Sequence, residues 1–215
     1  MPRTKEQYEE IKRRRREEIL LTALKLFCKK GYEATSVDDI VCEVGCSHGL
    51  FYHYFKGKQE IYDNILEKSR GNAIATIKAI SEDDTLTAVQ KLEKATEYYY
   101  DNIIHDETFA YYFYFKISNI FINANFNFDK AKIPKERPSV SYIYDIMEKG
   151  QRDGELDSGF SAKEYTMLYW SIVQGTTLNL VIAPHSLRHK LQAPNIKLIT
   201  EIFKKRQEAE LEKNT

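Results

Sequence analysis

The stretch TSVDDIVCEVGCSHGLFYHYFKGK, residues 35–58, contains two short helical segments on either side of a glycine. Hydroxyl groups at Thr35–Ser36 can cap the first segment, which we expect to end near residue 43. Gly45 allows a tight turn, and Ser47 can cap the second segment, residues 48–54. Two short helices joined in this way form a helix-turn-helix, whose second helix enters the major groove of DNA.

Several residues in the second segment and on either side of it suit contact with DNA. Hydroxyl groups can bond to phosphate, imidazoles can donate to phosphate or base edges, a glycine permits close approach, and a lysine at a helix start adds positive charge. These candidates are Ser47, His48, Gly49, Tyr52, His53 and Lys58. Tyr52 could instead pack in the core, as we expect Ile40, Val44, Phe51 and Phe55 to do.

Residues 16–66 resemble the DNA-binding domain of the TetR family of regulators. The family pattern runs F-x-x-x-G-[YF], T-[ST]-V-x-x-I-A, A-G-V-S-x-G and L-Y-x-H-F-x-x-K-x-x-L. The matching residues are Phe27, Gly31, Tyr32, Thr35, Ser36, Val37, Ile40, Gly45, Ser47, Gly49, Tyr52, Phe55, Lys58 and Ile61. The departures are Val41, Val44, Cys46, Phe51 and Tyr54.

The resemblance implies an all-α homodimer with two domains. Residues 1–58 would form the three-helix DNA-binding domain, and residues 59–215 a larger helical domain for ligand binding and dimerisation. The two recognition helices would enter successive major grooves, roughly 34 Å apart. The resemblance adds Thr35 or Ser36 as phosphate contacts, and Tyr54, which stands where the family has His.

The charge distribution agrees with a nucleic-acid partner at one end of the chain. The whole chain has 32 Lys+Arg and 32 Asp+Glu. Residues 1–58 contain 12 basic and 9 acidic residues, a net charge of +3, and the remainder has −3. The basic run Lys12–Arg16 either reaches DNA as an arm or forms a solvated face paired with neighbouring glutamates.

We expect the protein in a reducing cytoplasm, without a membrane span. Its three cysteines cannot form a closed set of disulfides, and its basic N-terminus has no apolar core of the secretory type. The apolar stretch 109–128 contains Lys116 and several asparagines, so we expect a buried helix there.

The second half of the chain is rich in aromatic residues, with 12 of the 27 aromatics in residues 98–128. These either form a pocket for a small hydrophobic or aromatic effector, or fill a core without a cavity. The candidate pocket residues are Tyr99, Ile103, Phe109, Tyr112, Phe113, Lys116, Trp170 and Gln174.

Two helical segments, residues 140–154 and 162–183, resemble the pair with which TetR-type proteins dimerise. Small residues there would allow close helix approach. The candidate interface residues are Ile143, Met147, Leu168, Ser171, Ile172, Gly175 and Asn179. The same face could pack within one subunit instead.

These features predict a DNA-binding transcriptional regulator, by family default a repressor, that binds palindromic operator DNA and is released by a small effector. We expect neither an enzyme nor a cofactor or metal site, because the chain contains no P-loop, H-E-x-x-H or G-x-S-x-G motif. Three rivals stay open: a metal-assisted activity through His185 and His189, redox sensing through Cys28, Cys42 and Cys46, and an adaptor that does not bind DNA.

Overall fold

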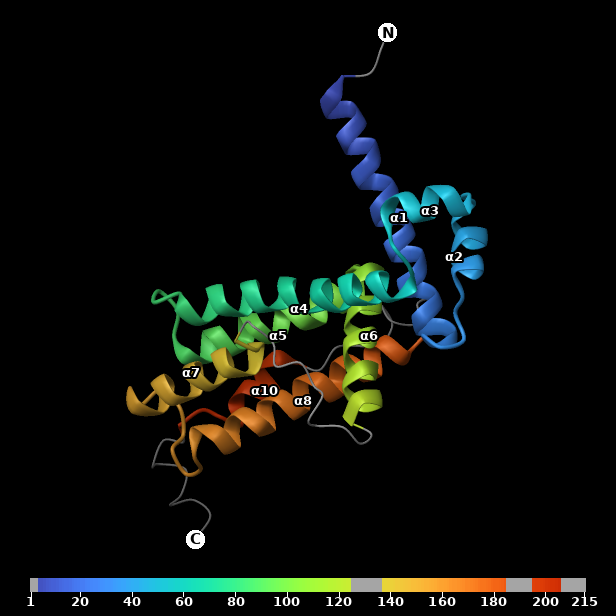
Figure 1. The fold of residues 1–215 in the computed structure, drawn as a ribbon. Helices are drawn as coiled ribbons and strands as arrows, with labels where there is room; N and C mark the ends of the chain where they lie inside the picture. The colour runs from blue at the N-terminus through green and yellow to red at the C-terminus, as the bar shows by residue number, and fades with distance from the viewer. Residues whose placement is uncertain (1–3, 125–136, 185–194, 206–215) are drawn as a thin grey trace. The chain divides into compact units, whose positions relative to one another are not determined.

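The computed structural model describes residues 4–124, 137–184 and 195–205. Its elements are helices, as Figure 1 shows, and the predicted all-α class is confirmed. The helices are α1 (Lys5–Lys30), α2 (Val37–Val44), α3 (His48–Tyr54), α4 (Lys58–Glu82), α5 (Ala88–His105), α6 (Glu107–Ala124), α7 (Ser139–Arg152), α8 (Ala162–Ile182) and α10 (Ile196–Glu201).

The chain divides into two compact units. The first comprises residues 1–70 and 111–129, and the second residues 71–110 and 130–215. Helices α4 and α6 therefore each contribute residues to both units. The first unit includes the beginning of α4, up to residue 70. The domain boundary predicted at residue 58 stays a prediction.

The core of the first unit is built around one face of α1. Positions 19, 20, 23, 24 and 27 of α1 are buried, as their helical spacing predicts. Phe51 and Phe55, at and just after α3, are 0% and 1% exposed and lie in the same cluster. Ile40 of α2 is also fully buried, while Val44 is half-buried. Burial of these side chains attaches α2 and α3 to α1.

Polar caps fix where the helices of the first unit begin. Thr4 and Gln7 form a reciprocal capping box at the start of α1, and Ser36 does the same with Asp39 at α2. Gly45 ends α2 in the left-handed conformation, with φ 67°. This conformation favours glycine and lets the chain turn directly into α3.

The core of the second unit lies where α5, α7 and α8 pack together, with α10 on α5. Tyr169 of α8 is completely buried, and its hydroxyl lies 2.8 Å from Thr96 Oγ1 of α5. Burial raises the pKa of the Tyr169 hydroxyl. This hydrogen bond satisfies a polar group that would be costly to bury alone.

Gly150 of α7 tests the packing of the second unit. A Cβ at this position would lie 2.6 Å from Ala88 Cβ and 2.6 Å from Leu156 Cδ1. We therefore expect Gly150→Ala to lower the free energy of unfolding by about 1–3 kcal/mol, as overpacked cores do. Urea unfolding followed by circular dichroism measures this change.

Gly71→Ala is the matched control, because a Cβ at that position has no neighbour within 4 Å. It should leave stability unchanged or raise it by up to about 1 kcal/mol. Equal effects of the two substitutions would contradict the described packing of α7.

Candidate DNA-binding surface

The turn between α2 and α3 is held by backbone hydrogen bonds. The N–H of Gly45 donates to the Cys42 carbonyl, and the N–H of Cys46 donates to the Val41 carbonyl at 3.0 Å. The Ser47 hydroxyl then accepts the N–H of Leu50 at 3.2 Å, which caps α3. This turn is the connection predicted for a helix-turn-helix.

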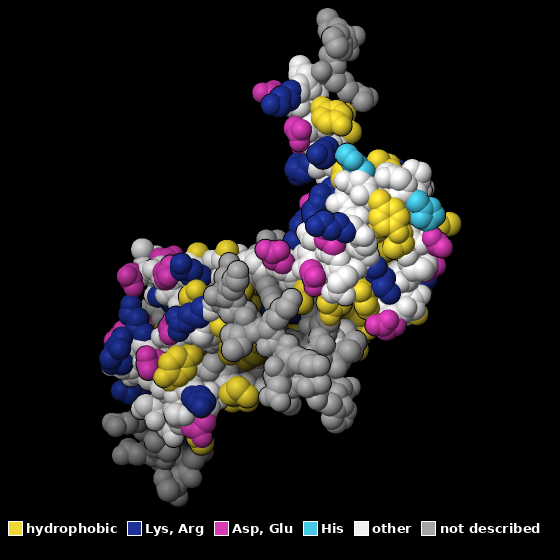
Figure 2. Space-filling view, viewed as in Figure 1, with side chains coloured by type: hydrophobic (Ala, Val, Ile, Leu, Met, Phe, Trp, Pro, Cys, Tyr) yellow, Lys and Arg dark blue, Asp and Glu magenta, His cyan; other side chains and the backbone are white. Residues whose placement is uncertain are grey.

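Helix α3 presents a polar face to the exterior. Phe51 is buried, whereas Ser47, His48, Gly49, Tyr52 and His53 are exposed. Tyr52 has an exposed fraction of 55%, and its ring packs edge-on against Phe51, with the centroids 5.3 Å apart. Figure 2 shows histidine side chains at the surface of this unit, beside exposed hydrophobic ones. The structure thus brings five predicted contacts together on one surface.

His48 has a partner that sequence reasoning missed. Its Nε2 lies 2.6 Å from the Asp38 carboxylate of α2, although both side chains are largely exposed. The ten-residue separation of the pair carries no local signal, because it depends on how the turn folds.

Neither crowding within the protein nor a left-handed backbone requires a glycine at position 49. An added Cβ would have only the Ser47 hydroxyl oxygen as a neighbour, at 3.9 Å, and its φ is not left-handed. The position therefore offers open space in front of α3.

Thr35 corrects the predicted set of contacts. Its side chain is 1% exposed, and its hydroxyl donates to the Gly31 carbonyl at 2.7 Å. The Thr35 hydroxyl thus fixes the loop after α1, and the prediction of a phosphate contact by this side chain is wrong.

Ser36 is exposed at the start of α2. Its hydroxyl donates to the Asp39 carboxylate at 2.7 Å and accepts the N–H of Asp39 at 3.0 Å. The Lys30 ammonium, together with the hydrogen bonds from Ser36, lowers the pKa of the Asp39 carboxyl. A stabilised carboxylate therefore lies beside Ser36.

Lys58 and Tyr54 both have internal contacts. The Lys58 ammonium donates to the Tyr32 carbonyl at 2.8 Å and lies 4.1 Å from the centroid of the Tyr32 ring. It joins the start of α4 to the segment after α1, and its contact with phosphate stays a prediction. Tyr54 is half-buried and packs against the core of the first unit.

The candidate ligand residues are distributed over both units. Tyr112, Phe113 and Lys116 belong to the first unit, whereas the other five belong to the second. Tyr99 and Ile103 are 2% and 0% exposed, so they fill the core. Periodicity shows which residues share a helix face, but not whether that face is filled.

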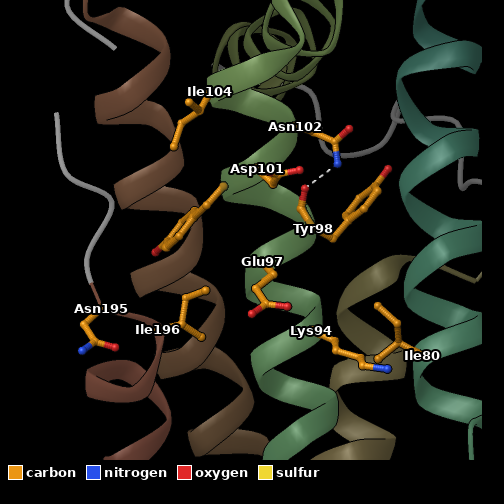
Figure 3. Close-up of a pocket in the computed structure, with 10 residues that line it drawn as sticks. Ile80, Lys94, Glu97, Tyr98, Asp101, Asn102, Ile104, Asn195 and Ile196 are labelled. Atoms are coloured by element: carbon orange, nitrogen blue, oxygen red, sulfur yellow. Dashed lines mark hydrogen bonds between the residues drawn. The ribbon is translucent and has the colours of Figure 1, made fainter. Parts of the chain in front are cut away.

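The second unit contains an open groove of about 830 Å³ beside α5. Figure 3 shows Glu97, Tyr98 and Asp101 on α5, with Asn195 and Ile196 beside the start of α10. The Asn102 side-chain amide donates to the Tyr98 carbonyl at 2.6 Å. None of the predicted pocket residues lines this groove.

The candidate interface residues divide between the core and the surface. Ile143 and Met147 of α7 are fully buried within the subunit, so their prediction as interface residues is wrong. The candidates on α8 are different: Ile172 is half-buried, and the others are exposed, namely Leu168, Ser171, Gly175 and Asn179. Ile182 continues this exposed face and is 63% exposed.

The described residues bear on the rival reading of a metal-assisted activity. Among them, no group of three His, Cys, Asp or Glu side chains could hold a metal ion. His185 and His189 lie outside the described residues. None of the helices that the structure describes is long and apolar enough to cross a membrane.

The N-terminal region of the chain is similar to known proteins. Residues 19–65 match the family model described as bacterial regulatory proteins, tetR family. The helix-turn-helix regulator YerO of Bacillus subtilis is 38% identical over 69 residues, covering 32% of this chain and 24% of its own length. The chain thus spans about a quarter of this relative.

Two longer similarities extend beyond that region. The transcriptional repressor KstR2 of Mycolicibacterium smegmatis is 26% identical over 143 residues, covering 65% of this chain and 66% of its own length. The solved ketosteroid transcriptional regulator KstR2 of Mycobacterium tuberculosis has a TM-score of 0.66 and 17% identity, covering 89% of this chain and 96% of the other. This second similarity shows a shared fold.

The cysteines give a test of the local packing. Burial raises the pKa of the Cys28 thiol to about 12, whereas Cys42 is exposed. Because the thiolate is the reactive form, the raised pKa keeps Cys28 protonated and poorly reactive at pH 8. We expect iodoacetamide at pH 8 to label Cys42 well before Cys28, as mass spectrometry of peptides would show. Equal labelling of both cysteines in the folded protein would contradict this packing.

Proposed function

Because the chain is a member of the TetR family of bacterial regulatory proteins, we propose that it regulates transcription by binding operator DNA through α3. One observation carries the proposal: α3 is anchored by Phe51 and turns Gly49, Tyr52 and His53 outward. A short helix with this exposed face has the form required to enter the major groove.

The contacts divide by chemistry. Residues at the start of α3, Ser47 to Gly49, and His53 contact base edges. Tyr52 and Lys58 contact phosphates, and Lys58 has further ammonium hydrogens besides the one given to Tyr32.

A small hydrophobic or aromatic effector, sensed in the cytoplasm, would release the protein from DNA. Helix α4 supports this coupling because it is one continuous helix whose residues belong to both units. The groove beside α5 supplies apolar walls at Ile80, Ile104 and Ile196. An effector shifts the equilibrium only as far as it binds the DNA-free conformation more tightly. Relatives of both kinds occur, the repressor KstR2 and the activator FasR of Mycolicibacterium smegmatis, so repression here follows the default of the family.

The exposed face of α8 supports a homodimer, which would bind a palindromic site. Leu168, Ser171, Gly175, Asn179 and Ile182 follow each other at intervals of three or four residues. A Cβ at Gly175 has no neighbour within 4 Å, so this face is open for a second helix.

The DNA-binding proposal is tested by Gly49→Ala. The protein selects a duplex from a random pool, and its affinity for that duplex is then measured by fluorescence anisotropy. We expect Gly49→Ala to lower the affinity roughly tenfold, because the added methyl group would meet DNA. Thermal stability should be unchanged or slightly raised, since the methyl group has space within the protein and alanine favours a helix.

Tyr52→Phe provides the matched comparison on the same face. Loss of its hydroxyl should weaken binding equally for correct and mismatched duplexes, as expected of a phosphate contact. The proposal fails if no duplex is enriched, or if Gly49→Ala and Tyr52→Phe both bind like the wild type.

The dimer is tested by Leu168→Glu, which places a charge on the exposed face of α8. We expect this variant to sediment as a monomer in analytical ultracentrifugation, because burying the carboxylate between two copies would be costly. Phe160→Glu is the control: Phe160 is 61% exposed and precedes α8. A Leu168→Glu protein that remains dimeric would contradict this assignment.

A further inference from the structure

The helix-turn-helix lacks the charges that usually dominate affinity for DNA. Residues 36–55 contain no Lys or Arg and three acidic residues, Asp38, Asp39 and Glu43. Neutralisation of phosphates by basic side chains supplies most non-specific affinity for DNA. If α3 reads DNA, much of the positive charge must therefore come from elements beside it.

Helix α1 begins well before its first buried residue. The first buried residue of α1 is Ile19, so the fourteen residues Lys5–Glu18 precede it. At 1.5 Å per residue, this extension is about 21 Å long. Figure 1 shows that it continues past α3 within the first unit.

One face of the extension combines basic and apolar side chains. Tyr8, Lys12 and Arg16 follow each other at intervals of four residues and continue the face that carries Ile19 into the core. Tyr8 is 57% exposed, and Ile11, at the edge of this face, is 43% exposed. Figure 2 shows Lys and Arg side chains along this part of the surface.

The base of this face lies against the helix-turn-helix. The Arg16 guanidinium is 4.7 Å from the centroid of the Phe55 ring and donates to Asn64. Arg15 donates to Glu18 one turn further along α1. The face therefore begins beside the proposed reading helix and continues away from it.

The other basic residues of the run are held on other sides of the helix. Arg13 and Arg14 both pair with Glu10, and Glu17 pairs with Lys68 of α4. The pairs of Arg13 and Arg14 with Glu10 agree with the alternative that part of the basic run forms a solvated face paired with glutamates. Lys12 is exposed and has no ion pair or hydrogen bond to any side chain in the part of the chain that the structure describes.

We infer that the extension of α1 is a second DNA-contacting element, which binds the phosphate backbone beside the bases read by α3. Lys12 supplies the charge, and the Tyr8 hydroxyl donates to a neighbouring phosphate. The element gives affinity without sequence preference, because phosphates are the same in every sequence. The inference rests on the proposed function.

Salt titration of Lys12→Gln tests it, with the duplex selected by the wild type. We expect affinity to fall on the order of fivefold, equally for correct and mismatched duplexes. The slope of log affinity against log salt should become shallower by about 0.9 per protomer, since one contact no longer releases a counterion. Tyr8→Phe should weaken binding with little change in slope.

Lys163→Gln is the matched control, because it removes the same charge from an exposed residue of α8 in the second unit. It should keep the wild-type slope.

A duplex trimmed at both ends gives a second test. Removal of the flanking base pairs should weaken DNA binding by the wild type and leave binding by Lys12→Gln nearly unaffected.

The results distinguish the inference from the proposed function. If the wild type enriches no duplex, the proposed function fails. If the wild type binds and Gly49→Ala weakens binding, but Lys12→Gln has the wild-type affinity and slope, the inference alone is overturned. Loss of dimerisation in Lys12→Gln with an unchanged slope would assign this face to a second copy, and would also overturn it.

Discussion

Burial of Phe51 and Phe55 in the core of the first unit fixes the orientation of α3. The helix has seven residues, too few to be stable alone, so its position depends on this packing. With Phe51 turned inward, the helical period turns Gly49, Tyr52 and His53 outward. The candidate surface is therefore a direct consequence of the core, and the turn at Gly45 sets where α3 begins.

The sequence predicted this part of the molecule well, because its signals are local. Hydroxyl caps, the glycine turn and the spacing of buried side chains all act within about four residues. Ser36, Gly45 and Ser47 take the positions expected of them. Thr35 was mistaken for an exposed contact because its hydroxyl could serve either the loop or DNA, and only the fold shows that it bonds to Gly31.

Features that depend on distant contacts could not be predicted in the same way. Ile143 and Met147 have the spacing of an interface face and also that of a core face, and burial in the second unit decides between them. The pair of His48 and Asp38 depends on the angle between α2 and α3. The groove beside α5 depends on which residues of α4 and α10 lie near it, and aromatic composition carries no information on that point.

The most direct test of the account is dimethyl sulfate footprinting of the wild-type protein on its selected duplex. This reagent methylates guanine N7 in the major groove, where α3 would lie. We predict two protected patches related by symmetry, with centres about one helical turn or a multiple of it apart. Uniform methylation with and without protein, or protection of the minor groove alone, would contradict the assignment of α3 as the reading helix.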